Sequence, residues 1–144
     1  MVPVELTIYI PGPIVAKSLK LTARGNFARA YRPANLRAYM DTISQEAILA
    51  MRKAGYRKPM KGAFCVEVAA IVEPPKSWPK GKREAAMRSN YWHTVKPDMD
   101  NILKLKDALK GIVWDDDCQV AWENGFKKYG RNAGLTFQIH TLGP

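Results

Sequence analysis

Aspartate is concentrated in one stretch of this chain, and clustered carboxylates are groups that can do chemistry. Six of the seven aspartates lie between Lys96 and Val120. They are Asp98, Asp100, Asp107, Asp115, Asp116 and Asp117. Two like charges about 5 Å apart repel by roughly 3 kcal/mol at an effective dielectric near 20, so a fold that gathers several needs a compensating cation. Oxygen ligands favour Mg²⁺ or Mn²⁺, which can bind a phosphate oxygen and lower the pKa of a water.

The rest of the chain is strongly basic. It has 23 Lys and Arg residues against 13 Asp and Glu, for a net charge of +10. Such an excess favours a polyanionic partner, and nucleic acid is the first candidate. An anionic membrane surface would also attract it, but there is no long apolar run and residues 1–5 do not resemble a signal peptide. We therefore expect a cytoplasmic protein that does not enter a membrane.

Chain length and cysteine content limit the number of domains and the kinds of cross-link that we expect. The 144 residues predict one domain, 1–144, and 47% hydrophobic residues are enough to fill one core. Cys65 and Cys118 are too few for a disulfide framework and match no zinc spacing, so we expect both to be reduced.

The acidic stretch must position its carboxylates. Pro97 favours extended backbone before it, and in extended backbone Asp98 and Asp100 would share a face. We expect a helix to start near Asn101, with Lys104 one turn after Asp100 on the same side. Lys104 could then hold a phosphate or stabilise an oxyanion.

The same helix has an apolar side that predicts burial. Gly111 fits its C-terminal cap, Trp114 is a candidate core anchor, and Asp115 to Asp117 follow on a turn. The expected buried stripe is Ile102, Leu105, Leu109 and Ile112.

A plainer interpretation of these aspartates also exists. Asp100 could be only a helix cap, Asp98 a favourable charge near a helix N-terminus, and residues 115–117 an ordinary polar turn. The spacing alone leaves the cap and the metal site both open.

A basic segment without any acidic residue runs from Ile14 to Ala34, and we expect it to be a loop. Its cations can hold phosphates and its rings can stack on unpaired bases, so we expect it to contact DNA. The alternative is a solvated loop with no ligand. The expected DNA-binding residues are Lys17, Lys20, Arg24, Arg29 and Arg32, with Phe27 and Tyr31 interleaved.

The remaining pattern predicts an α+β fold. One long helix should follow a cap at Asn35 and end at Gly55, and a short basic helix should lie within 77–90. Four strands are expected, at Val4–Ile10, Phe64–Val72, Val120–Lys128 and Leu135–His140. We expect the last two to form an antiparallel hairpin. The predicted architecture is one mixed four-stranded sheet with two main helices packed on one face.

The acidic stretch resembles the signature of the RusA-like Holliday junction resolvases. That signature is approximately K-P-D-x-D-N-[LI]-x-K, then D-A-L, then G-x-x-W-x-D-D-x-Q-[VI]. The chain has KPDMDNILK from Lys96, DAL from Asp107 and GIVWDDDCQV from Gly111. The resemblance implies that Asp98, Asp100 and Asp117 are metal-binding catalytic carboxylates, that Lys104 is the catalytic lysine, and that Asp116 has a supporting role.

The resemblance also implies a function. Members of this family are small, basic and usually encoded by phages or prophages. They act as homodimers on four-way DNA junctions and nick two strands symmetrically with Mg²⁺ or Mn²⁺. We therefore expect a DNA endonuclease of recombination and repair, without an organic cofactor, in a bacterial or phage-infected cell. The alternatives are a non-catalytic basic DNA-binding protein and a metal nuclease that acts on other branched or duplex DNA.

One departure from the family pattern concerns the helix. Family members usually have three residues between the lysine and D-A-L, whereas only Leu105 and Lys106 separate Lys104 from Asp107. A missing helical residue shifts later positions by about 100° around the axis. Either the turn before Trp114 absorbs this shift, or Asp117 is displaced relative to Asp98 and Asp100.

Overall fold

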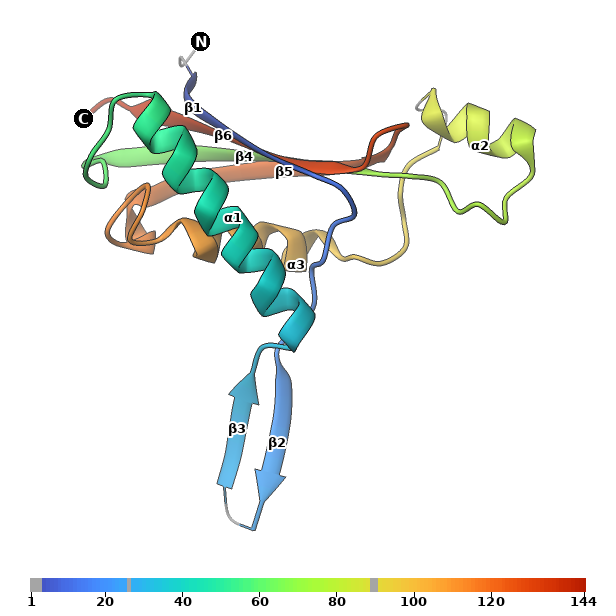
Figure 1. Cartoon of the computed structure of the whole chain (residues 1–144), viewed down its shortest axis with the longest axis horizontal. Coiled ribbons are helices and arrows are strands. Elements are labelled where there is room, and N and C mark those ends of the chain that lie inside the picture. Colours follow the sequence, from blue (N-terminus) through green and yellow to red (C-terminus); the bar gives the residue numbers. More distant parts are fainter. Residues whose placement is uncertain (1–3, 26, 89–90) are drawn as a thin grey trace.

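The structure is a computed structural model that describes residues 4–25, 27–88 and 91–144, with the side chains of Arg24 and Phe27 outside the description. Figure 1 shows the arrangement of its elements. The strands are β1 (Val4–Pro11), β2 (Lys20–Arg24), β3 (Phe27–Tyr31), β4 (Ala63–Val72), β5 (Val120–Tyr129) and β6 (Gly134–Leu142). The α-helices are α1 (Ala34–Lys53), α2 (Lys80–Met87) and α3 (Met99–Leu103), and the 3₁₀ helices are η1 (Lys104–Leu109) and η2 (Asp117–Gln119).

The main sheet is mixed and has the strand order β1-β6-β4-β5. The β4–β5 pair is parallel, and the β1–β6 and β4–β6 pairs are antiparallel. The predicted α+β class and mixed four-stranded sheet are confirmed. The predicted hairpin of the last two strands is wrong, because β4 lies between β5 and β6 and pairs with both.

The two faces of the main sheet have different residues, as the period of two along a strand requires. Ile8 and Val68 flank Phe137 on one face, and all three are buried. This face carries α1 and the segment from α3 to η1, which confirms the expected two-helix layer on one side of the sheet.

Helix α1 packs its predicted apolar face into the core. Its buried residues are Leu36, Tyr39, Met40, Ile43, Ala47 and Met51. The helix begins after Pro33, which occupies the cap position without a side-chain hydrogen bond, so the predicted Asn35 cap is wrong. The end is as expected, since Gly55 has φ of 89°, a left-handed value that suits glycine, and the Tyr56 amide donates to the Met51 carbonyl at 2.9 Å.

The basic segment is not a loop throughout. Strands β2 and β3 pair antiparallel and form a hairpin that projects from the body beside the start of α1 (Figure 1). We call this hairpin the arm. The sequence interpretation missed it because the strands are short and no core residues mark them. The described side chains of the arm are exposed, including Leu21 at 76%.

The short basic helix expected within 77–90 is present as α2, set apart from the helical layer (Figure 1). In the part of the chain that the structure describes, no helix is long and apolar enough to cross a bilayer.

Candidate active site

From the cap residue Asp98 the chain continues without a break through α3 and η1 to Leu109, and because this stretch carries the predicted catalytic residues we call it the catalytic segment. Asp98 is extended, with φ of −71° and ψ of 146°, and α3 starts at the next residue. Asp100 therefore lies in the first turn of the helix. The expected shared extended face of Asp98 and Asp100 is wrong, whereas the helix expected near Asn101 is present and starts two residues earlier, at Met99.

Asp98 and Asp100 each form an ion pair with a lysine. The Asp98 carboxylate lies 2.9 Å from Lys96 Nζ, and the Asp100 carboxylate lies 3.1 Å from Lys104 Nζ. The two carboxylates are 51% and 80% exposed. Ion pairs this exposed contribute about 0–1 kcal/mol, so a stronger cationic ligand can displace them at little cost. The structure thus confirms that Lys104 lies beside Asp100.

Asp117 is linked to the core through Trp114. The indole Nε1 of Trp114 donates to Asp117 Oδ1 at 3.0 Å, and the Trp114 ring is fully buried against Phe64. A buried indole needs an acceptor, and Asp117 supplies it. Among the described residues, no hydrogen bond or ion pair involves the second oxygen of Asp117, so that oxygen is available to a ligand.

Asp116, unlike Asp117, uses its side chain to cap a helix. It caps η2 by accepting a hydrogen bond from the Cys118 amide at 3.0 Å. This backbone bond is the main cause that lowers the pKa of Asp116 below its usual range. The stabilisation by this cap is present above the ordinary carboxyl pKa and is lost as the pH falls through the lowered one. Asp116 therefore serves the turn, which supports Asp117 as the candidate ligand.

The three expected ligands are not gathered into one cluster. Within residues 4–25, 27–88 and 91–144, no group of three His, Cys, Asp or Glu side chains is placed to hold a metal ion. The donor chemistry of Asp98 and Asp100 nevertheless fits Mg²⁺, because both are exposed carboxylates two positions apart in the sequence. Asp117 would have to approach them from the η2 turn.

The helix type changes at the place where one residue is missing relative to the family pattern. The chain winds as a 3₁₀ helix from Lys104 to Leu109, where the family pattern has one residue more. Five steps of a 3₁₀ helix turn by about 600°, as do six steps of an α-helix. Leu109 therefore keeps the direction that a full-length α-helix would give it and is completely buried. The winding of η1 thus accounts for the burial of Leu109, whereas Asp98, Asp100 and Asp117 are still not gathered into one cluster among the described residues.

Strand β5 holds the catalytic segment in place. Lys127 Nζ donates to the carbonyls of Val95 at 2.8 Å and Pro97 at 3.0 Å, immediately before Asp98. Lys106 in η1 forms a 2.8 Å ion pair with Glu123. Sequence reasoning missed these positioning residues because the contacts join segments 17 to 32 positions apart.

The turn that carries Asp117 depends on Gln119. The Gln119 Oε1 accepts hydrogen bonds from the amides of Asp115 and Asp116, both at 3.0 Å. The Gln119 Nε2 donates to the carbonyls of Met60 and Gly62, both at 3.1 Å. One side chain therefore fastens the turn to the segment that enters β4. The motif matched this glutamine but gave no reason for it.

We expect Gln119→Ala to destabilise the protein by about 2 kcal/mol, because four partly exposed hydrogen bonds of about 0.5–1.5 kcal/mol each would be replaced in part by water. Urea unfolding measures the change. Gln138→Ala is the matched control, since Gln138 lies on the sheet and has no side-chain hydrogen bond among the described residues. Equal stability of the two variants would contradict the role assigned to Gln119.

The root of the arm lies against the catalytic segment. A cavity of about 260 Å³ is lined by Lys17 and Arg32 from the arm side and by Lys104 and Asp107 from η1. Arg32 lies 3.6 Å from Asp107, and Ser18 accepts a long, 3.3 Å hydrogen bond from Asn101. Two of the expected DNA-binding cations are thus brought next to Lys104.

The other expected DNA-binding cations lie farther out on the arm. The ladder pairs Lys20 with Tyr31 and Thr22 with Arg29, and these alternate with the apolar pair Leu21 and Ala30. One face of the ribbon is therefore cationic and the other apolar. The side chain of Arg24 lies outside the described residues.

These features define a small basic α+β protein with an acidic helical segment at the base of a cationic arm. A family model of DNA endonucleases matches residues 11–140, which is most of the chain. The chain belongs to that family, Endodeoxyribonuclease RusA. A search of curated proteins finds no match. Family membership confirms the resemblance identified in the acidic stretch.

Proposed function

We propose that this endonuclease resolves four-way DNA junctions by paired symmetric nicks and that it requires Mg²⁺, with Mn²⁺ as a substitute. The observation that carries the proposal is the position of Lys104, which lies beside Asp100 and also lines the cavity at the root of the cationic arm. DNA held by the arm would therefore pass the carboxylates. In this proposal the protein acts in recombination and repair, in the cytoplasm of a bacterial or phage-infected cell.

The candidate metal ligands are Asp98, Asp100 and Asp117. When bound, the cation would polarise the scissile phosphate and lower the pKa of a water. The chain itself orients the ligands, since Lys127 fixes the backbone before Asp98 and Trp114 holds one oxygen of Asp117. Lys104, already beside Asp100, would contact a non-bridging phosphate oxygen and stabilise charge that develops there.

The arm would grip DNA. A two-stranded β-ribbon fits the major groove of B-DNA, and the face with Lys20 and Arg29 would meet the phosphates. A homodimer would present two equivalent sites to a junction that can itself be two-fold symmetric, which accounts for paired nicks.

A nicking assay tests the proposal. Labelled four-way junction and linear duplex of the same sequence are incubated with the protein in Mg²⁺ and in EDTA. We expect paired nicks on the junction alone, and none in EDTA. If linear duplex is cleaved as fast as the junction, the protein is a nuclease that is not selective for four-way junctions. Tight binding without nicks in either Mg²⁺ or Mn²⁺ would reduce it to a DNA-binding protein.

A further inference from the structure

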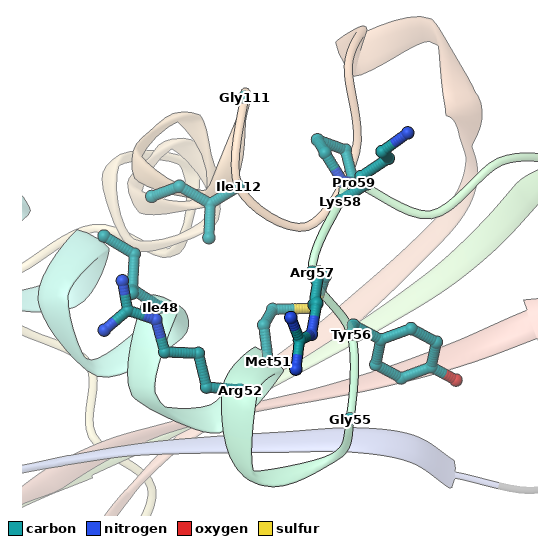
Figure 2. Close-up of a pocket in the computed structure, with 10 residues that line it drawn as sticks. All are labelled: Ile48, Met51, Arg52, Gly55, Tyr56, Arg57, Lys58, Pro59, Gly111 and Ile112. Carbon is teal, nitrogen blue, oxygen red and sulfur yellow. The ribbon is translucent and has the colours of Figure 1, made fainter.

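A second cavity, drawn in Figure 2, lies at the C-terminal end of α1, the end away from the arm in Figure 1. It is open and has a volume of about 800 Å³. Three cations line it, Arg52 from α1 and Arg57 and Lys58 from the segment that follows. We call it the distal pocket.

The walls of the distal pocket are fixed by backbone turns. On one side, α1 ends at Lys53 and the chain turns at Gly55 toward Pro59. On the other side, Gly111 has φ of 81° and its amide donates to the Trp114 carbonyl at 2.7 Å. Gly111 and Ile112 directly continue the catalytic segment. The distal pocket and the candidate active site are therefore built on one stretch of chain.

The residues that line the distal pocket carry positive charge only, and the one carboxylate bonded to a lining residue is that of Glu5, which accepts a hydrogen bond from the Tyr56 hydroxyl at 3.1 Å. No carboxylate is among its lining residues, and no ion pair with Arg52, Arg57 or Lys58 occurs in the described part of the chain. All three cations are exposed. Cations that are exposed and unpaired attract an anionic ligand rather than stabilise the fold.

The distal pocket also lies in line with the candidate active site. One row of α1 residues, spaced four apart, faces the catalytic segment: Leu36, Met40, Ser44, Ile48 and Arg52. Leu36 and Met40 line the cavity beside Lys104, whereas Ile48 and Arg52 line the distal pocket. Between the two cavities the Ser44 hydroxyl donates to the Ala108 carbonyl at 2.8 Å. The two cavities therefore lie at opposite ends of the contact between α1 and the catalytic segment, and we call this contact the seam.

We propose that the distal pocket binds the sugar–phosphate backbone of a DNA arm, a proposal that rests on the function proposed above. Met40 and Arg52 are separated by about 18 Å along the helix, which corresponds to about five base pairs at about 3.4 Å each. A duplex that reaches Lys104 therefore spans the seam within half a helical turn. The cations meet phosphates, and the aliphatic side chains of Ile48 and Ile112 suit the apolar face of deoxyribose.

The test compares two double variants. Arg57→Ala/Lys58→Ala removes two cations of the distal pocket, and Lys53→Ala/Lys61→Ala removes two exposed cations nearby that do not line it. Binding of a labelled four-way junction is measured by fluorescence anisotropy in EDTA at several salt concentrations. We expect the salt dependence, log K against log salt, to lose about 1.8 in slope in the pocket variant, because each phosphate contact contributes about 0.9. We expect little change in slope in the control.

Equal slopes in the two variants would overturn the proposal, since the cations would then act only through net charge. Unchanged DNA binding, combined with loss of binding to poly-glutamate, would assign the distal pocket to an acidic protein partner and also overturn it. The measurement needs no cleavage. If the protein does not nick DNA but the pocket variant still shows the reduced salt slope, the DNA-binding role of the distal pocket stands and the proposed nuclease activity is refuted.

Discussion

Asp100→Asn is expected to reduce nicking of a four-way junction by about 10³-fold or more while DNA binding is retained. The substitution keeps the size of the side chain but removes a charged oxygen ligand, and metal-based charge stabilisation supplies several kcal/mol in such reactions. Binding should tighten slightly, because Lys104 loses its 3.1 Å partner and its charge becomes available to phosphate. Single-turnover nicking and anisotropy measure the two effects separately.

Asp115→Asn is the matched control for Asp100→Asn. Asp115 belongs to the same acidic stretch and is exposed, and its carboxylate makes no hydrogen bond or ion pair among the described residues. We expect its nicking rate to stay within about threefold of the unmodified protein. If the two variants lose activity equally, the acidic stretch acts through its overall charge and the assignment of Asp100 fails.

Trp114→Ala is expected to destabilise the protein by about 3–5 kcal/mol, the usual cost of removing a large ring from a packed core. Trp114 is completely buried and its ring centroid lies 5.9 Å from that of Phe64. The variant also removes the donor that holds Asp117. Urea unfolding measures the loss, with Trp92→Ala as control, because Trp92 is 69% exposed.

Trp114→Phe separates packing from positioning. A phenyl ring keeps most of the buried surface but cannot donate to Asp117, so we expect a smaller loss of stability together with slower nicking. A variant that is destabilised but nicks at the normal rate when folded would show that the Trp114–Asp117 hydrogen bond does not matter for activity.

Local patterns in the sequence predicted the helices and the strands of the main sheet better than they predicted which strands pair in the sheet. The apolar face of α1 and the four strands of the main sheet follow from periodicity, which depends on neighbouring residues. Periodicity does not say which strands pair. β5 pairs in parallel with β4, and β6 pairs with the other edge of β4, so β5 and β6 are consecutive in the sequence but are not neighbours in the sheet.

The motif assigns roles to Asp98, Asp100, Lys104 and Asp117 from their types and spacing, and these roles stay predictions. The residues that hold this part of the chain in place were not predicted. The contacts of Gln119 and Lys127 reach backbone carbonyls far away in the sequence, and no local pattern contains them. The 3₁₀ winding of η1, at whose end Leu109 is completely buried, was likewise not predicted.

The most direct test of the metal site is the position of Mn²⁺ in crystals soaked with the ion, read from its anomalous scattering. We expect one strong peak within about 2.2 Å of carboxylate oxygens from Asp98, Asp100 and Asp117, with the lysine ion pairs of the first two opened. A peak that involves Asp116 instead would correct the third ligand. The absence of any peak at Asp98 and Asp100, in crystals that bind Mn²⁺ elsewhere, would contradict the metal site itself.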